Sequence, residues 1–321
     1  MADLESVVEG RSEAAPYGGR RLGATALRRV LDAHHAWLQG QPGGSRANLN
    51  GIVLAEANLE NLNFERAVLR SANFIEARLS GANLSGADLQ WADLSSATLL
   101  DADLSKADLM DATLELTLLS AANLSEARLL RTRCRRANLR AARIIEAGME
   151  ECDFSGAVLR SAGLHQSRAF DCNFAEADLT EAKLYHVVFR FCHLQGISGS
   201  GSNWSTASLQ GCEFRLADMP FSRFDRADLS RSSFYRANLR SGSFREARMA
   251  GADLERADLS GARFHDAGLM GTSLRGANLE HAQGLTPAQL GQARTSEETI
   301  LPNGTHGPFM LGSGAHRPRR C

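Results

Sequence analysis

The sequence predicts a solenoid, in which the chain winds into a regular coil and each five-residue repeat forms one side and turns a corner. Two observations predict this fold class. An apolar residue recurs at every fifth position from Leu49 to Leu279, and the phase does not slip over 47 consecutive repeats. A small residue stands two positions earlier, and it is Ala in 31 of the repeats. Because a period of five fits neither a helix nor a flat strand, one large and one small side chain per repeat must point inward.

The residues at the inward positions indicate a narrow core. The large position is Leu in 29 repeats and Phe in 10, whereas Ala169 and Gly199 are too small to fill it. A typical repeat is Ala-Asn-Leu-Ser-Gly at residues 82–86. The chain is 43% hydrophobic but only 6% aromatic, as a core of Ala and Leu requires. We expect residues 165–204 to be underpacked and to unfold first, with a bulge or bend at the glycines of residues 195–202.

This pattern resembles the pentapeptide-repeat family over residues 45–284. The resemblance implies an all-β fold, a right-handed quadrilateral parallel β-helix with four repeats per coil. The 47 repeats would then form nearly twelve coils. At ~4.8 Å per stacked strand this is a rod roughly 55 Å long.

Four repeats per coil would stack residues that lie 20 positions apart, and the sequence contains two such columns. The small inward position carries a cysteine ladder, and the large inward position carries an aromatic column. Their members are Cys152, Cys172, Cys192 and Cys212 for the ladder, and Trp204, Phe224, Phe244 and Phe264 for the column. The thiols could bind metal or form disulfides, but parallel stacking suits neither a tetrahedral site nor disulfide geometry. We therefore interpret both columns as structural.

The ends of the solenoid need caps, because they expose apolar side chains and strand edges. Residues 25–39 carry a helical apolar stripe that includes His34, with Trp37 beside it, and Thr286 with Pro287 starts a second short helix. The predicted organisation is, in order, a disordered tail at 1–20, an N-terminal capping helix at 21–44, the β-helix at 45–284, a C-terminal cap at 285–302, and a disordered tail at 303–321.

The sequence contains no pattern that indicates catalysis. It has no phosphate-binding loop, no His-Glu-x-x-His and no nucleophile elbow, so we expect neither enzymatic activity, a metal nor a cofactor. His165, Tyr185 and His186 should approach one another, with no carboxylate in the same column. Seven arginines between residues 128 and 143 should form a belt around all four sides, paired with Glu126, Glu146, Glu150 and Glu151.

A broken apolar stripe follows one corner of the predicted coil, and it is the candidate protein-docking surface. Its members are Trp91, Met110, Leu130, Phe170 and Phe191. Exposed apolar side chains that gather along one line indicate an interaction site. The alternative is that they are scattered, tolerated hydrophobic residues with local packing roles.

The predicted function is a non-enzymatic, cytoplasmic protein-binding scaffold with an unidentified protein partner, which includes a homodimer formed through a capped end or the apolar stripe. With 37 acidic and 36 basic groups, the net charge of −1 predicts neither a nucleic-acid nor a membrane partner. Residues 45–125 carry a net charge of −6 and residues 215–275 of +3, which favours head-to-tail association. The resemblance also implies two alternatives, a DNA mimic that binds type II topoisomerase (gyrase) with fluoroquinolone protection, and a bacterial effector delivered to a host.

Overall fold

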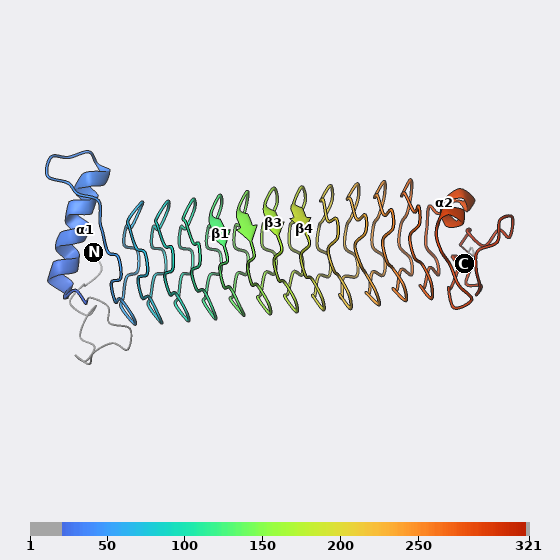
Figure 1. The fold of residues 1–321 in the computed structure, drawn as a ribbon, viewed down its shortest axis with the longest axis horizontal. Helices are drawn as coiled ribbons and strands as arrows, with labels where there is room; N and C mark the ends of the chain where they lie inside the picture. The colour runs from blue at the N-terminus through green and yellow to red at the C-terminus, as the bar shows by residue number, and fades with distance from the viewer. Residues whose placement is uncertain (1–20, 319–321) are drawn as a thin grey trace. The chain divides into compact units, whose positions relative to one another are not determined.

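The computed structural model describes residues 21–318, which fall into two compact units, unit 1 (Met1–Val158) and unit 2 (Leu159–Cys321). Each unit is a stack of coils in which a residue pairs in parallel with the residue 20 positions later (Figure 1). Asn48 pairs with Val68 in unit 1, and Lys183 with Asn203 in unit 2. This is the predicted quadrilateral parallel β-helix with four repeats per coil, so the predicted fold class is confirmed.

Four short strands belong to one side of the coils. In unit 1, β1 (Arg128–Leu130) pairs in parallel with β2 (Gly148–Glu150), and in unit 2, β3 (Arg168–Phe170) pairs with β4 (Val188–Arg190). The other sides pair through single-residue bridges, because each side has only about two residues of extended backbone before the next corner.

The corners explain the rest of the repeat sequence. At a typical corner, the Ala57 N–H donates to the Leu54 carbonyl (3.2 Å) and Glu56 has a φ of 61°, as in a type II turn. A left-handed φ costs a residue with a Cβ about 1 kcal/mol, so glycine is favoured there. The Asp or Asn before the large residue also supports the corner, because its side chain accepts a backbone N–H, as Asp93 does from Ser95 (3.0 Å).

Aromatic rings fill the core of unit 2 in two stacks at right angles. Trp204, Phe224, Phe244 and Phe264 stack nearly parallel, with centroids 6.1, 5.2 and 5.3 Å apart. Phe214 and Phe234 stack on another side at 4.5 Å, and Phe224 meets Phe234 edge to face at 84°. Such offset and T-shaped contacts add to the burial of the rings themselves.

The glycine-containing segment at residues 195–202 differs from its sequence prediction. The ladder continues through it without a bulge, since Ser198 bridges both Asp178 and Asp218. Gly196 and Gly201 lie at corners with φ of 67° and 68°, where glycine relieves strain. The core space at Gly199 is taken by Met219 of the next coil, so the predicted underpacking is wrong there.

A buried hydrogen-bond network supports the same region. The Trp204 indole donates to the Ser202 hydroxyl (2.8 Å), and Ser202 and Ser222 both donate to the Gly199 carbonyl (2.7 and 2.8 Å). Other polar side chains at the small inward position donate in the same way to a carbonyl of the preceding coil, as Thr132 does to Leu109 (2.9 Å). These polar groups therefore have partners despite burial.

Helices lie at the two chain ends. The helix α1 (Ala24–Leu38) lies at the N-terminal end of unit 1, where His34 is fully buried, stacks on Trp37 and accepts a hydrogen bond from the Ala47 N–H at Nδ1 (3.1 Å; Figure 1). The helix α2 (Pro287–Gln292) covers the last coils of unit 2, with Thr286 and Gln289 forming a capping box. Gln289 also donates to the Phe264 and Ala267 carbonyls.

The chain beyond α2 differs from the predicted disordered tail. Residues 303–318 form turns, in which the Leu301 N–H donates to Thr305 (2.8 Å) and the Asn303 N–H donates to Ala315 (3.3 Å). Ile300 bridges Asn278 of the last coil, which attaches this segment to unit 2. The predicted tail at 1–20 and the final residues 319–321 lie outside the described residues.

Filling the space at Gly199 should destabilise the core. A Cβ at this position would lie 3.1–3.2 Å from the Met219 side chain, so Gly199→Leu forces that side chain out of its packing. We expect a loss of about 1–3 kcal/mol of unfolding free energy, measured by chemical denaturation. Adding Met219→Ala should recover part of the loss, and a Gly199→Leu variant as stable as the wild type would contradict the packing described.

Attachment of α1 should weaken in acid. Burial lowers the pKa of His34 below its ordinary value of 6.5, because the neutral ring accepts from Ala47. Its contribution to stability is therefore complete above pH 6.5 and is lost as the pH falls below it. We expect the exchange protection of the Ala47 amide, corrected for intrinsic rate, to decrease between pH 7.5 and 5. His34→Asn, which can accept without titrating, should make that protection independent of pH.

Candidate functional site

One side of the coils carries the whole predicted stripe, and we call it side A. In unit 1, side A consists of the outward residues of 48–51 and of the segments that follow every 20 residues to 148–151. In unit 2 it consists of the equivalent residues from 168–171 to 268–271. The parallel ladder fixes these outward positions into straight columns.

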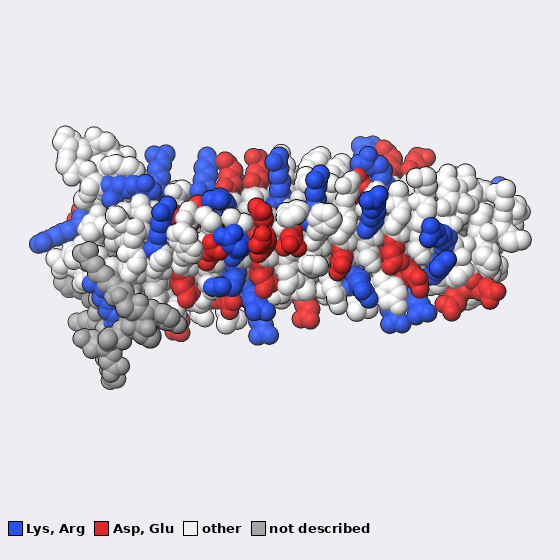
Figure 2. All heavy atoms as spheres, in the orientation of Figure 1, with Lys and Arg blue, Asp and Glu red and all other residues white. Residues whose placement is uncertain are grey.

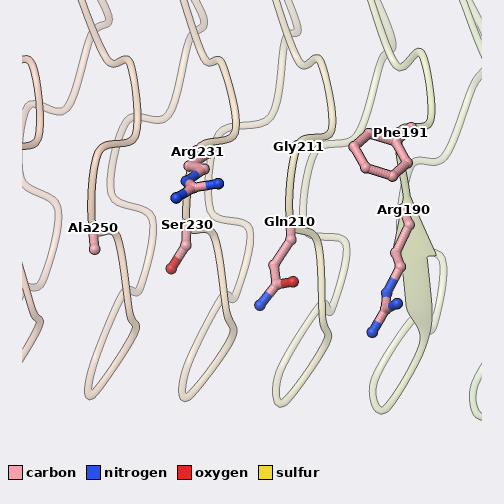
Figure 3. A pocket seen from close by; sticks show the side chains of 7 residues that line it. All are labelled: Arg190, Phe191, Gln210, Gly211, Ser230, Arg231 and Ala250. Atoms are coloured by element: carbon pink, nitrogen blue, oxygen red, sulfur yellow. The ribbon is translucent and has the colours of Figure 1, made fainter.

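A groove of about 540 Å³ lies on side A of unit 2, over four successive coils (Figure 3). Residues of three kinds line it, two arginines, one aromatic ring and a set of small or neutral polar groups. They are Arg190, Phe191, Gln210, Gly211, Ser230, Arg231 and Ala250. Figure 3 shows the side chains of Arg190, Gln210 and Ser230 projecting from the same side of successive coils.

The order of side chains along one corner column makes the hollow. Phe191, Gly211 and Arg231 follow one another at 20-residue intervals, so a missing side chain lies between two large ones. A Cβ on Gly211 would be 3.2 Å from the Phe191 ring, which shows that the ring leans over this glycine. The positive φ of 70° at Gly211 also favours glycine.

The groove has a surplus of positive charge. Asp228, beside it, is already bound by Gln210 (2.6 Å) and by Arg248 (2.9 Å). Burial opposes ionisation of Asp228, but hydrogen bonds from Ser230 and Gln210 outweigh it and hold the pKa of the carboxyl below its ordinary value. Among residues 21–318, no carboxylate lies within ion-pair distance of Arg190 or Arg231, so both can meet an external anion.

The structure divides the predicted stripe between the two units. In unit 2, Phe170 and Phe191 are 46% and 57% exposed and meet edge to face with centroids 5.8 Å apart. In unit 1, Trp91 is 52% exposed, while Met110 and Leu130 are half-buried. Only Phe191 of the stripe lines the groove.

The surroundings of Trp91 in unit 1 are ordered by charge. Arg131 binds Asp111 through two contacts of 2.7 Å, and the Trp91 indole also donates to this carboxylate. The hydrogen bond from Arg131, with that from Trp91, holds the pKa of Asp111 below its ordinary value. The Trp91 ring is thus positioned on the surface by a carboxylate.

Sequence reasoning found Phe191 but missed the other six residues that line the groove. It searched for exposed apolar side chains, and these six are cationic, polar or small. Stepping by 20 from Phe191 gives Gly211 and then Arg231, a large–small–large sequence that was available as a signal. The neighbouring column supplies Arg190, Gln210, Ser230 and Ala250 by the same step.

The cysteines of the ladder are buried and unbridged. In unit 1, Cys152 donates to the Leu129 carbonyl (2.7 Å). In unit 2, Cys192 exchanges hydrogen bonds with both of its neighbours in the column. The contact with Cys172 favours its thiolate, but the bond with Cys212 and burial disfavour it more strongly and raise the pKa of Cys192 to about 12.

The histidine cluster lies on another side of unit 2. The His165 ring stacks on Tyr185 at 4.6 Å, Tyr185 meets His186 edge to face, and His186 Nδ1 lies 2.8 Å from the Thr206 hydroxyl. Within residues 21–318, no group of three His, Cys, Asp or Glu side chains is placed to hold a metal ion. No helix in this part of the chain is long and apolar enough to cross a membrane.

The arginine belt is paired differently from the prediction. Arg128, Arg131 and Arg135 bind Asp108, Asp111 and Asp153, at 3.2, 2.7 and 3.1 Å. The partners lie one coil away, at 18 or 20 residues, because the ladder brings those positions together. The predicted pairing with Glu126, Glu146, Glu150 and Glu151 is therefore wrong for these three arginines. On the face shown in Figure 2, basic and acidic side chains interleave without a continuous field of either sign.

Comparisons with known families agree with this architecture. The pentapeptide repeats model matches in eight copies over residues 47–86, 87–117, 117–156, 232–269 and 247–283, and the pentapeptide repeat region model matches residues 142–219. These matches cover more than half of the chain, which therefore belongs to the pentapeptide-repeat family. A comparison with curated protein sequences found no significant match.

Several solved structures are similar to this chain. HetL, a pentapeptide repeat protein involved in heterocyst differentiation regulation in the cyanobacterium Nostoc, is 26% identical, with 88% of this chain and 98% of HetL covered and a TM-score of 0.26. A pentapeptide repeat protein of the Arabidopsis thaliana thylakoid lumen is 32% identical over 29% of this chain and 64% of its own (TM-score 0.28). QnrB1, a plasmid-mediated fluoroquinolone resistance protein, is 19% identical over 50% of this chain and 83% of its own (TM-score 0.28).

The thiols of the ladder should resist alkylation in the folded protein. A pKa of about 12 for Cys192 leaves about a thousandfold less thiolate at neutral pH than an unperturbed thiol of pKa 9 has. We expect Cys172, Cys192 and Cys212 to stay unlabelled by iodoacetamide at pH 7.5, and to be labelled fully in denaturant, as read by mass spectrometry. Rapid labelling of the native protein at these positions would contradict the buried ladder.

Proposed function

We propose that the protein is a non-enzymatic, cytoplasmic scaffold that binds another protein, and that the groove on side A of unit 2 is its docking site. The observation that carries the proposal is the exposed Phe191 ring beside a hollow, between two arginines that have no ion-pair partner within the described chain. Aromatic rings and arginines are the residues that most often dominate binding at protein interfaces.

The form of the site favours a protein over a metabolite. The groove lies on the outer surface of the coils and is lined by side chains from four of them. The interior beneath is filled by buried Leu209 and Leu229, so a small molecule could not be enclosed. Small-molecule sites generally bury most of their ligand, which a groove on a flat side does not do.

The backbone also limits the kind of recognition. In the stacked coils, N–H and carbonyl groups of each side bond to the coils before and after, as Phe189 does to Ser208 (2.8 Å). A partner therefore cannot add a strand along side A and must be recognised by side chains. This favours a folded surface or a peptide with an apolar anchor and acidic groups.

The DNA-mimic alternative has less support from the charge distribution. A mimic of DNA needs a continuous acidic surface. Several acids of unit 1 are neutralised by arginines of adjacent coils, such as Asp88 by Arg70 at 2.6 Å and Asp108 by Arg128 at 3.2 Å. In unit 2, residues 215–275 carry a net charge of +3.

Truncating the aromatic anchor should remove the partner. We expect a protein captured from host extract by the wild-type chain to be retained about thirtyfold less by Phe191→Ser, since truncating a central aromatic residue costs about 2 kcal/mol. Leu216→Ser is the control, because Leu216 is 54% exposed on another side of unit 2. Circular dichroism should show that both variants are folded.

Two results would contradict the proposal. The first is equal capture by wild type and Phe191→Ser. The second is inhibition of gyrase supercoiling, or protection of gyrase from a quinolone, by the purified protein, which would favour the DNA-mimic function.

A further inference from the structure

Side A has opposite net charge in the two units. In unit 1 its outward residues give −2, and in unit 2 they give +2. The charged residues are Asp88, Asp108, Asp111, Glu150, Glu151, Arg70, Arg128 and Arg131 in unit 1, and Asp171, Asp228, Arg168, Arg190, Arg231 and Arg248 in unit 2.

The charges that remain free are complementary. Within residues 21–318, Glu150 and Glu151 of unit 1 are exposed and no basic group lies within ion-pair distance of them. Arg190 and Arg231 of unit 2 are exposed and lack a carboxylate partner in the same way. Each surface also carries an exposed aromatic ring, Trp91 in unit 1 and Phe191 in unit 2, that association would remove from water.

We propose that side A of unit 1 in one copy of the chain docks, with antiparallel coils, on side A of unit 2 in a second copy. This inference rests on the proposed function, since it names one protein that the groove takes. Each copy has both surfaces, so either a closed dimer or an open chain of copies would result.

The 20-residue columns define the register. When two such sides face each other with antiparallel axes, each column lies on the same column of the other copy, and residue numbers run in opposite directions. Setting Glu150 opposite Arg190 then places residues 110–111 opposite 230–231 and residues 90–91 opposite 250–251. The spacing is the same on both surfaces, about 4.8 Å per coil, so the match extends along the whole contact.

This register matches charge and size in every column of the contact. It brings together three pairs of opposite charge, which are Glu150 with Arg190, Asp111 with Arg231, and Asp88 with Arg248. One like-charged pair arises, Asp108 with Asp228, and an arginine of its own copy already binds each of these carboxylates, at 3.2 and 2.9 Å.

The large side chains also meet small ones. The Trp91 ring comes opposite Ala250 and Gly251, and Arg131 comes opposite the hollow at Gly211. A bulky group of one copy therefore faces a gap in the other, which is the shape that close packing requires. Because one flat side offers a small contact area, we expect a weak complex, with a Kd roughly in the micromolar range.

Sedimentation of the purified full chain over a range of concentrations tests the proposal. We expect concentration-dependent association that weakens as salt rises from about 50 to 500 mM, because exposed charges are screened over about 10 Å or less. The pair Arg190→Glu and Arg231→Glu should raise the Kd about tenfold or more by placing like charges opposite one another. Arg263→Glu with Arg275→Glu is the matched control, since both arginines are exposed on other sides of unit 2.

A charge swap tests the register itself. Glu150→Arg and Arg190→Glu should each weaken association, and the two together in one chain should restore it, because each copy then offers the reversed pair. As a second measurement, mild oxidation of a mixture of Glu150→Cys and Arg190→Cys chains should give a disulfide-linked heterodimer between these positions.

Failure of the inference can be told apart from failure of the proposed function. A wild-type chain that stays monomeric at about 200 μM, or self-association unaffected by Arg190→Glu with Arg231→Glu, would overturn the inference. Swapped charges that do not restore association would overturn the register. If any of these occurs while a different protein is still lost from the Phe191→Ser chain, the docking site stands with an acidic partner other than a second copy.

Discussion

The hydrogen bonds between successive coils constrain everything else in this protein. The Leu49 N–H donates to the Val68 carbonyl, and the pattern repeats because each coil closes after 20 residues. One inserted residue would move the large side chains of all later repeats out of the core. Closure in so few residues also requires a sharp corner after every repeat, which accounts for left-handed residues such as Glu56 and Trp91. Local strain at the corners is thus offset by bonding along the columns.

The same ladder decides what the surface can do. Because the stacked backbone groups are bonded, the sides are read through their side chains, and these stand in straight columns. A single substitution in a column therefore has a geometric consequence for its neighbours. At Gly211 the absence of a side chain lets the Phe191 ring lean over the next coil and opens a hollow before Arg231. A groove arises in this way without any loop or insertion in the repeat.

Charge follows the columns as well. Most carboxylates of side A are held by an arginine one coil away, such as Asp111 by Arg131, and they contribute little to an external partner. The groups that lack such a neighbour, Arg190 and Arg231, stand where Gln210 and Ser230 replace acids in the adjacent coils. Near-neutral net charge thus conceals small regions of free charge, and these give the surface its polarity. Recognition by such regions depends on geometry more than on total charge.

The sequence by itself determined the fold, because a period of five with large and small inward residues admits only one kind of coil, and Cys and Phe spaced by 20 indicate its circumference. It also identified Phe191, since an exposed aromatic ring stands out in such a regular pattern. It could not determine that Met219 fills the space at Gly199, because packing between coils depends on side-chain conformation. Nor could it assign the partners of Arg128 and Arg131, or show that Gly211 forms a hollow. Those features depend on distances between columns, which only the tertiary structure decides.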